Sequence, residues 1–128
     1  CDMHSMPHEA LSNHAARGGA RPDVVLGDRW GASARPDVVE AVEAVLRDTG
    51  FVVARNTPFA GAYIAQRYGR PSQGIHAVQI EIDRGLYLDE ERIELLPDFE
   101  SFRRVMRNVV ERLAALDPGE TARDLAAE

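Results

Sequence analysis

The sequence contains one cysteine, no lysine and no long apolar run. Because Cys1 is the only cysteine, the chain cannot form an internal disulfide, and this usage is typical of a reducing compartment. We therefore expect a cytoplasmic protein. No segment approaches the roughly 18 apolar residues of a membrane helix, so we expect no membrane span.

Positive charge is also scarce. The sequence has fifteen basic and 21 acidic residues, which gives a net charge of -6. This balance argues against nucleic-acid binding, which usually requires a basic face. A chain of 128 residues has the length of one domain. We predict a single domain over residues 1–128, in which residues 117–128 form a loosely held tail.

Apolar periodicity predicts helices at Pro36–Asp48 and at Asp98–Leu116, and a shorter one at Ala60–Tyr68. The first helix has proline in its first turn, and Ser33 lies close enough in sequence to cap it. Short apolar segments predict strands after Asp23 and at Phe51–Ala54. The order strand, helix, strand indicates an α/β fold.

A third strand is predicted at Ile75–Ile82, and it lies within the region, residues 56–91, that is richest in candidate site residues. Alternation places Val78, Ile80 and Ile82 on one face, and Gln79 and Glu81 on the other. A solvated polar sheet face would explain this pattern. A site at the end of the strand would also explain it, because carboxylates at such positions often have chemical roles.

The first residues of the chain are typical of the end of a strand whose beginning is missing, so we expect a fragment of a longer enzyme. In a strand, Asp2 and His4 would share a face. That arrangement suits a metal-ligating histidine oriented by a carboxylate, although an ordinary surface histidine is the alternative. His8 and His14 match no metal motif, and we interpret them as solvated.

A polar turn follows the strand after Asp23 and displays Asp28 and Arg29 between two glycines. It is either a surface turn with an Asp–Arg pair or a loop that offers Arg29 to an acidic substrate. Asn56, which precedes Thr-Pro, also has two interpretations: it forms an Asx turn, or it contacts a ligand.

Several motifs occur together in a fixed order: Asp-x-His-Ser-Met-Pro, Leu-Gly-Asp-Arg-x-Gly, Asn-x-Pro-Phe-x-Gly-x-Tyr-Ile, Tyr-Gly-x-Pro and Gly-x-His-Ala-x-Gln-x-Glu. This series resembles the C-terminal half of the N-formylglutamate amidohydrolases, also called N-formylglutamate deformylases. The resemblance implies a zinc-carboxypeptidase-like scaffold, with a mostly parallel mixed sheet flanked by helices. It also implies hydrolysis of an amide with one zinc ion.

Carried over to this sequence, the resemblance makes His4 the third of three zinc ligands and Asp2 its supporting carboxylate. It makes Glu81 the catalytic carboxylate, which takes a proton from water and delivers it to the leaving amine. The family's first pair of ligands has no counterpart in residues 1–128. We therefore expect these residues alone to be inactive, because a catalytic zinc needs about three protein ligands.

The implied substrate is a small acyl-amino acid, most simply N-formyl-L-glutamate in histidine degradation. Its carboxylates need cationic and amide partners, and the candidates are Arg70, Asn56, Arg29 and Tyr63. Two alternatives stay open. The first is a related amide hydrolase or carboxypeptidase-like enzyme with another substrate, and the second is a metal-free remnant that acts only as a binding module. The sequence does not indicate the oligomeric state.

Overall fold

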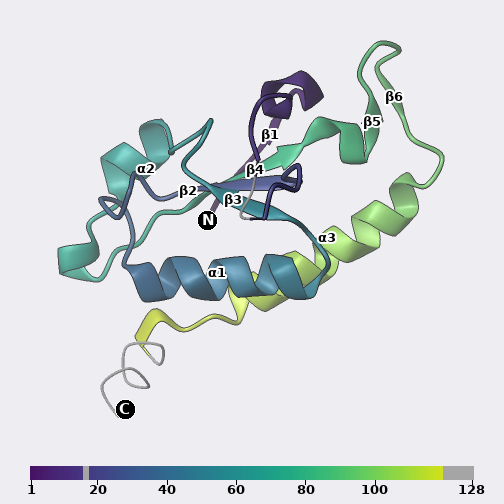
Figure 1. Ribbon diagram of the computed structural model, residues 1–128. Coiled ribbons are helices and arrows are strands. Elements are labelled where there is room, and N and C mark those ends of the chain that lie inside the picture. The colour runs from purple at the N-terminus through teal and green to yellow at the C-terminus, as the bar shows by residue number, and fades with distance from the viewer. Residues whose placement is uncertain (16–17, 120–128) are drawn as a thin grey trace.

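The computed structural model describes residues 1–15 and 18–119, which form a four-stranded sheet with helices against it (Figure 1). The strands are β1 (Asp2–Met6), β2 (Val24–Gly27), β3 (Val53–Arg55) and β4 (Gln79–Asp83). Their order across the sheet is β1-β4-β2-β3. The β1–β4 and β2–β3 pairs are parallel, whereas β2 and β4 are antiparallel. This confirms the predicted α/β class and its mostly parallel mixed sheet.

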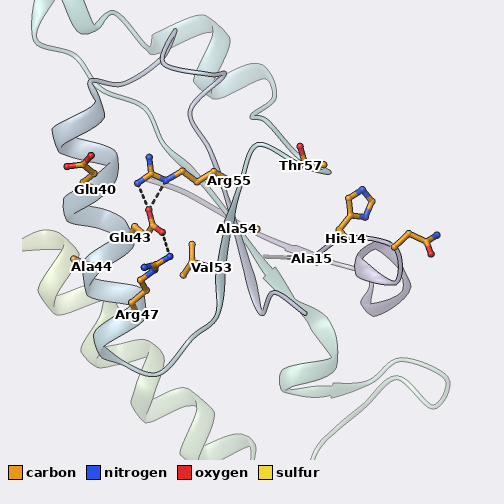
Figure 2. Close-up of a pocket in the computed structure, with 11 residues that line it drawn as sticks. His14, Ala15, Glu40, Glu43, Ala44, Arg47, Val53, Ala54, Arg55 and Thr57 are labelled. Atoms are coloured by element: carbon orange, nitrogen blue, oxygen red, sulfur yellow. Dashed lines mark hydrogen bonds and ion pairs between the residues drawn. The ribbon is translucent and has the colours of Figure 1, made fainter. Parts of the chain in front are cut away.

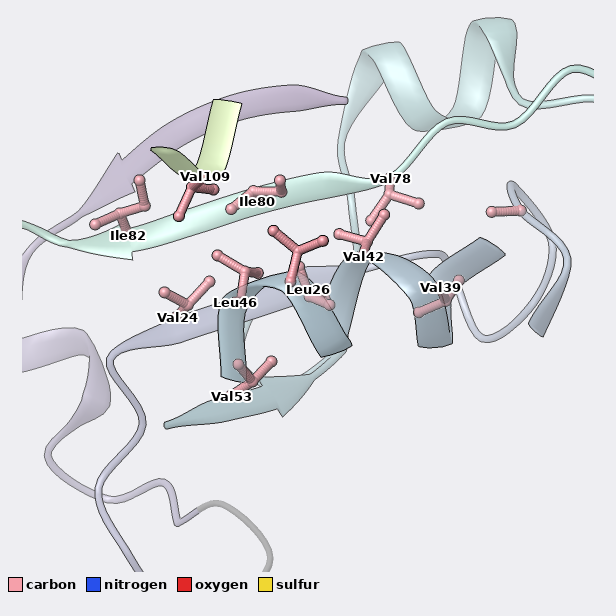
Figure 3. Close-up of a cluster of buried hydrophobic side chains, with 12 residues drawn as sticks. Val24, Leu26, Val39, Val42, Leu46, Val53, Val78, Ile80, Ile82 and Val109 are labelled. Atoms are coloured by element: carbon pink, nitrogen blue, oxygen red, sulfur yellow. The ribbon is translucent and has the colours of Figure 1, made fainter. Parts of the chain in front are cut away.

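Helices α1 (Pro36–Asp48) and α3 (Phe99–Ala114) both pack on one face of the sheet (Figure 1). The core lies between them and that face. Its side chains come from alternate positions of the strands, from Val78 just before β4, and from α1 and α3. Figure 3 shows how they meet: Val24, Leu26, Val39, Val42, Leu46, Val53, Val78, Ile80, Ile82 and Val109. The predicted phase of the 75–82 segment is therefore correct.

The opposite face of the sheet is covered by loops and short turns. Met6, Leu11 and Val25 form a small buried cluster there, and Phe59 packs against it. Leu11 belongs to the 3-10 turn His8–Leu11, which directly follows β1, and Phe59 belongs to the loop after β3. This thinner layer leaves room for polar side chains on the same face.

Several predicted boundaries differ from the structure. Helix α2 begins at Tyr63 and ends at Tyr68, so the predicted helix starts three residues too early. Strand β4 begins at Gln79, because Ile75 instead forms an isolated bridge with Arg70 in a turn. A further hairpin, β5 (Leu88–Asp89) with β6 (Glu94–Leu95), is absent from the sequence prediction.

The prediction that Ser33 caps α1 is wrong. The Ser33 hydroxyl donates instead to the carbonyl of Ala77 at 2.7 Å, and Arg35 is the residue before the first turn. The Arg35 guanidinium donates two hydrogen bonds to Asp37, at 3.0 and 2.9 Å. Of the predicted loose tail, residues 117–119 are described and residues 120–128 lie outside the described residues.

Candidate functional site

The site is built on the loop-covered face of β4. Gln79, Glu81 and Asp83 alternate with the core residues of that strand, and each is less than 9% exposed. Parallel pairing with β1 places Asp2 beside Gln79 and His4 beside Glu81. Because paired residues in a sheet share a face, two segments almost eighty positions apart bring their polar side chains together.

Asp2 and His4 share one face of β1, as predicted from their spacing. His4 Nε2 lies 2.9 Å from Asp2 Oδ2, and the His4 side chain is 46% exposed. A carboxylate that holds one ring nitrogen fixes the orientation of the imidazole. The other nitrogen, Nδ1, is then the atom that His4 offers to a ligand.

Glu81 is a buried carboxylate surrounded by charged groups. Burial raises the pKa of the Glu81 carboxyl, and nearby Asp2 raises it further, whereas His4 and Arg84 act in the opposite direction. Glu81 is the central residue of β4 and does not lie at the end of the strand, where the sequence predicted a site. A buried carboxylate with a raised pKa is suited to accept and return a proton. Gln79 Nε2 donates to Glu81 Oε1 at 2.9 Å, which fixes one of the two oxygens.

Asn56 lies in a buried cluster and holds the turn after β2. Its Nδ2 donates to Asp28 Oδ1 at 2.7 Å, and its Oδ1 accepts from the Asp28 amide at 3.1 Å. Arg29 and Trp30 in that turn both have positive φ, 53° and 51°. Left-handed non-glycine residues cost about 1–3 kcal/mol each and tend to occur at functional sites. Asn56 thus supports the turn that displays Arg29.

The other predicted substrate contacts, Arg29, Tyr63 and Arg70, lie on different elements. Arg29 contacts the loop between β3 and α2, because its backbone amide donates to the Ala60 carbonyl at 2.8 Å. The Ala62 amide of the same loop donates to Gln79 Oε1. Tyr63 is 66% exposed and begins α2, one residue after that loop. Arg70 lies two residues after the end of α2, and its Nη1 donates to the Gly69 carbonyl at 2.6 Å and to that of Gln66 at 3.1 Å.

The interpretation of His8 as merely solvated missed a contact. Its Nδ1 lies 2.8 Å from Asp83 Oδ2, and the Asp83 side chain is 5% exposed whereas that of His8 is 56% exposed. The Gly85 amide donates to the same carboxylate. No local signal marks this pair, because the two residues are 75 positions apart in sequence and meet only through the β1–β4 pairing.

These side chains do not by themselves form a complete metal centre. Within residues 1–15 and 18–119, no three His, Cys, Asp or Glu side chains lie grouped so as to hold a metal ion. His4 is a suitable single ligand, since its imidazole is accessible and oriented by Asp2. A catalytic zinc needs about three protein ligands, so the described residues do not fit a zinc site on their own.

A cavity of about 900 Å³ lies elsewhere, between α1 and the free edge of β3 (Figure 2). Glu43 lines it from α1 and forms ion pairs with Arg47 and Arg55 (Figure 2). The residues that line this cavity include none of Asp2, His4, Gln79 or Glu81. The cavity is therefore separate from the candidate site.

In the described part of the chain, no helix is long and apolar enough to cross a membrane.

Comparisons with known proteins agree with the motif order. The family model for N-formylglutamate amidohydrolase matches residues 1–88. The N-formylglutamate deformylase of Pseudomonas aeruginosa is 37% identical over 103 residues, which cover 76% of this chain and 38% of that protein. The Pseudomonas putida enzyme of the same name is 38% identical over 73 residues, or 56% of this chain and 27% of that protein.

A solved structure shows the same fold. The N-formylglutamate amidohydrolase from Ralstonia eutropha aligns with a TM-score of 0.72 and 34% identity, over 95% of this chain and 42% of that one. The match therefore spans about two fifths of the Pseudomonas aeruginosa and Ralstonia eutropha proteins, and about a quarter of the Pseudomonas putida protein.

The fold and site define a mixed α/β protein that presents an oriented histidine and a buried carboxylate on one face of its sheet. The family match covers more than half of the chain, and a relative at more than 30% identity covers three quarters of it. The chain belongs to the N-formylglutamate amidohydrolase family.

Proposed function

We propose that the protein to which this chain belongs hydrolyses an N-acyl amino acid, most simply N-formyl-L-glutamate to formate and L-glutamate. The observation that carries this proposal is the pairing of His4 with Glu81 across β1 and β4, on a face where Glu81 is buried and oriented. The names of the matched relatives support the choice of substrate.

In this proposal Glu81 is the general base and then the general acid. Its carboxylate takes a proton from the water that attacks the formyl carbon, and the same proton is passed to the nitrogen as the C–N bond breaks. The products are formate and the free amine of glutamate. The raised pKa of Glu81 favours this double role, because the group must be able to hold the proton between the two steps.

We also propose that His4 is one ligand of a zinc ion, with Asp2 orienting its ring. Zinc would supply Lewis-acid activation of the amide when bound. The described residues provide only this one ligand, so the proposal requires further ligands from the full-length gene product. Metal content of that product, measured by elemental analysis before and after chelator treatment, tests this part independently of any assay.

For the substrate carboxylates, we propose Arg29 as the principal partner and Arg70 as a second candidate. The turn that carries Arg29 is fixed by the buried Asp28–Asn56 pair, and its backbone contacts the loop that reaches Gln79. Tyr63 would donate a hydrogen bond from the start of α2. Asn56 would act by holding the turn, since its amide is already bonded to Asp28.

A substrate panel tests the reaction. The purified full-length gene product should release formate from N-formyl-L-glutamate faster than it releases acetate or succinate from the N-acetyl and N-succinyl analogues. Faster cleavage of another acyl group would assign the alternative amide hydrolase, and faster cleavage of a C-terminal peptide bond would assign the carboxypeptidase-like one. No turnover of any member, in a folded protein, would favour the binding module.

A further inference from the structure

Gln79 makes two hydrogen bonds that link separate parts of the structure. Its Oε1 accepts from the backbone amide of Ala62 at 2.9 Å, and its Nε2 donates to Glu81 Oε1 at 2.9 Å. The side chain is only 3% exposed, so water does not compete for these bonds. Gln79 therefore joins the loop after β3 to the proposed catalytic carboxylate.

The chemistry of the two neighbours fixes the orientation of the Gln79 amide. A backbone N–H can only donate, and an ionised carboxylate can only accept. Turning the amide over would place Nε2 against the Ala62 N–H and Oε1 against the Glu81 oxygen, so both bonds would be lost. A buried amide with one orientation holds both neighbours in place, because leaving a buried polar group unpaired is costly.

The loop at the other end of this link is itself firmly seated. The Ala60 carbonyl accepts from the Arg29 amide, and Phe59 packs against the cluster of Met6 and Val25. A Cβ added at Gly27 would lie 2.5 Å from the Ala60 backbone, so the loop touches β2 directly. Ala62 then leads into Tyr63, the first residue of α2.

We propose that Gln79 is a positioning residue, which makes the orientation of Glu81 depend on the seating of the 57–62 loop that leads to Tyr63. One chain of contacts, Tyr63–Ala62–Gln79–Glu81, then connects Tyr63, the proposed substrate contact, with Glu81, the proposed base. Its catalytic consequence rests on the proposed function, whereas the link itself does not.

A double-mutant cycle in the full-length gene product tests this role. Gln79→Met keeps the length of the side chain and removes both bonds, and Gln66→Met in α2 is the matched control. We expect Gln79→Met to lower kcat about 10- to 100-fold, as misplacement of a reacting group does. In a Glu81→Gln background the same substitution should have little further effect, because Gln79 acts through Glu81.

A merely structural glutamine would give equal fold losses in both backgrounds, and that result would overturn the proposal. An unchanged kcat in a folded Gln79→Met protein would overturn it as well. Melting temperatures identify variants that do not fold. If Gln79→Met is one of them, Gln79→Asn, which is one methylene too short to span both partners, replaces it with the same expected outcome.

Hydrogen exchange separates this proposal from the proposed function. The Ala62 amide should exchange slowly in the parent protein and faster in Gln79→Met, while Gln66→Met leaves it unchanged. The Gln79 side-chain amide protons should exchange faster in Glu81→Leu. If the parent releases no formate, the proposed function fails, and these exchange rates still decide whether Gln79 makes the link. Unchanged exchange in both variants would overturn it.

Discussion

At the scale of single residues, strand alternation predicted more of the site than any motif spacing did. It placed Glu81 opposite the core residues Ile80 and Ile82, and Asp2 on the same face as His4, and the structure confirms both. It did not show that Gln79 bonds to Glu81 or that His8 bonds to Asp83. The first depends on side-chain rotamers and the second on the pairing of distant strands, and neither leaves a local trace in the sequence.

A prediction at this scale concerns Arg29 and Arg70, the two arginines proposed to bind substrate carboxylates. Arg29→Lys in the full-length gene product should lower kcat/KM for N-formyl-L-glutamate roughly tenfold or more, because an ammonium cannot replace a bidentate guanidinium. Arg70→Lys should have the smaller effect, since Arg70 already donates to two carbonyls at the end of α2. The measurement is steady-state kinetics of the two variants and the parent.

An analogue identifies the carboxylate involved. If Arg29 binds the side-chain carboxylate, the loss in Arg29→Lys should shrink with N-formyl-L-glutamine, which has an amide there. Equal losses with both substrates would assign Arg29 to the other carboxylate or to the turn itself. A larger loss in Arg70→Lys than in Arg29→Lys would reverse the assignment.

At the scale of elements, apolar residues that recur every three to four positions were sufficient to predict the two long helices. Helix α1 has the predicted bounds, and α3 differs from its prediction by one or two residues at each end. The apolar stripe of α3 is wider than the surface it covers: Val109 is fully buried, whereas Val105 and Val110 are 36% and 48% exposed. Sequence periodicity shows which residues can be buried, and the extent of the facing sheet decides which ones are.

The close contact between β2 and the 57–62 loop yields a second prediction. Gly27→Ala should destabilise the protein by about 1–3 kcal/mol, because the added methyl group meets backbone rather than a movable side chain. It should also lower activity by displacing Ala62 from Gln79. Chemical denaturation and turnover of the full-length gene product measure both effects.

Gly50→Ala is the matched control for this substitution. Gly50 has a φ of 97°, so alanine is strained there, but an added Cβ meets no atom within 4 Å. We expect the control to lose stability and keep its turnover per folded molecule. If Gly27→Ala also loses stability but keeps its turnover per folded molecule, the orientation of Glu81 does not depend on the position of the 57–62 loop.

The start of α1 gives a prediction about pH. The Arg35 guanidinium holds the pKa of the Asp37 carboxyl below its ordinary value. Because the folded pKa is lower than the unfolded one, the pair stabilises the fold fully above the ordinary pKa of 3.8, and this contribution is lost as the pH falls through the folded value.

Asp37→Asn should therefore melt below the parent at neutral pH, and the difference should narrow only below about pH 4, as the parent loses its own ion pair. Glu40→Gln, on the exposed face of the same helix, is the control. A difference in melting temperature that stays constant down to the acid limit would show that Asp37 acts by packing and not by charge.

At the scale of the whole molecule, the sequence predicted the α/β class but not the sheet order. The order strand, helix, strand correctly indicated an α/β fold, and in the structure it corresponds to the parallel pair β2 and β3 connected through α1. The insertion of β4 between β1 and β2, antiparallel to β2, is a long-range arrangement that no local pattern encodes. The site depends on it, because β4 must lie beside β1 for Glu81 to meet His4.

Metal binding supplies a prediction at the same scale. Residues 1–128 made alone should lose zinc on dialysis, because no three potential ligands group together in their described part. The full-length gene product should retain it. Elemental analysis of the two preparations, dialysed side by side, makes the comparison, and stoichiometric zinc in the shorter one would show that the ligand assignment is wrong.

The role of Glu81 is tested most sharply by the rate at which the full-length gene product releases formate from N-formyl-L-glutamate when only this residue is changed. We expect Glu81→Gln to keep the fold and the metal content and to lower turnover by roughly 10²–10⁴-fold, as loss of a general acid–base group does. Glu94→Gln, on exposed β6, should leave turnover unchanged. Near-parental turnover in a folded Glu81→Gln protein would show that Glu81 is not the general acid–base group.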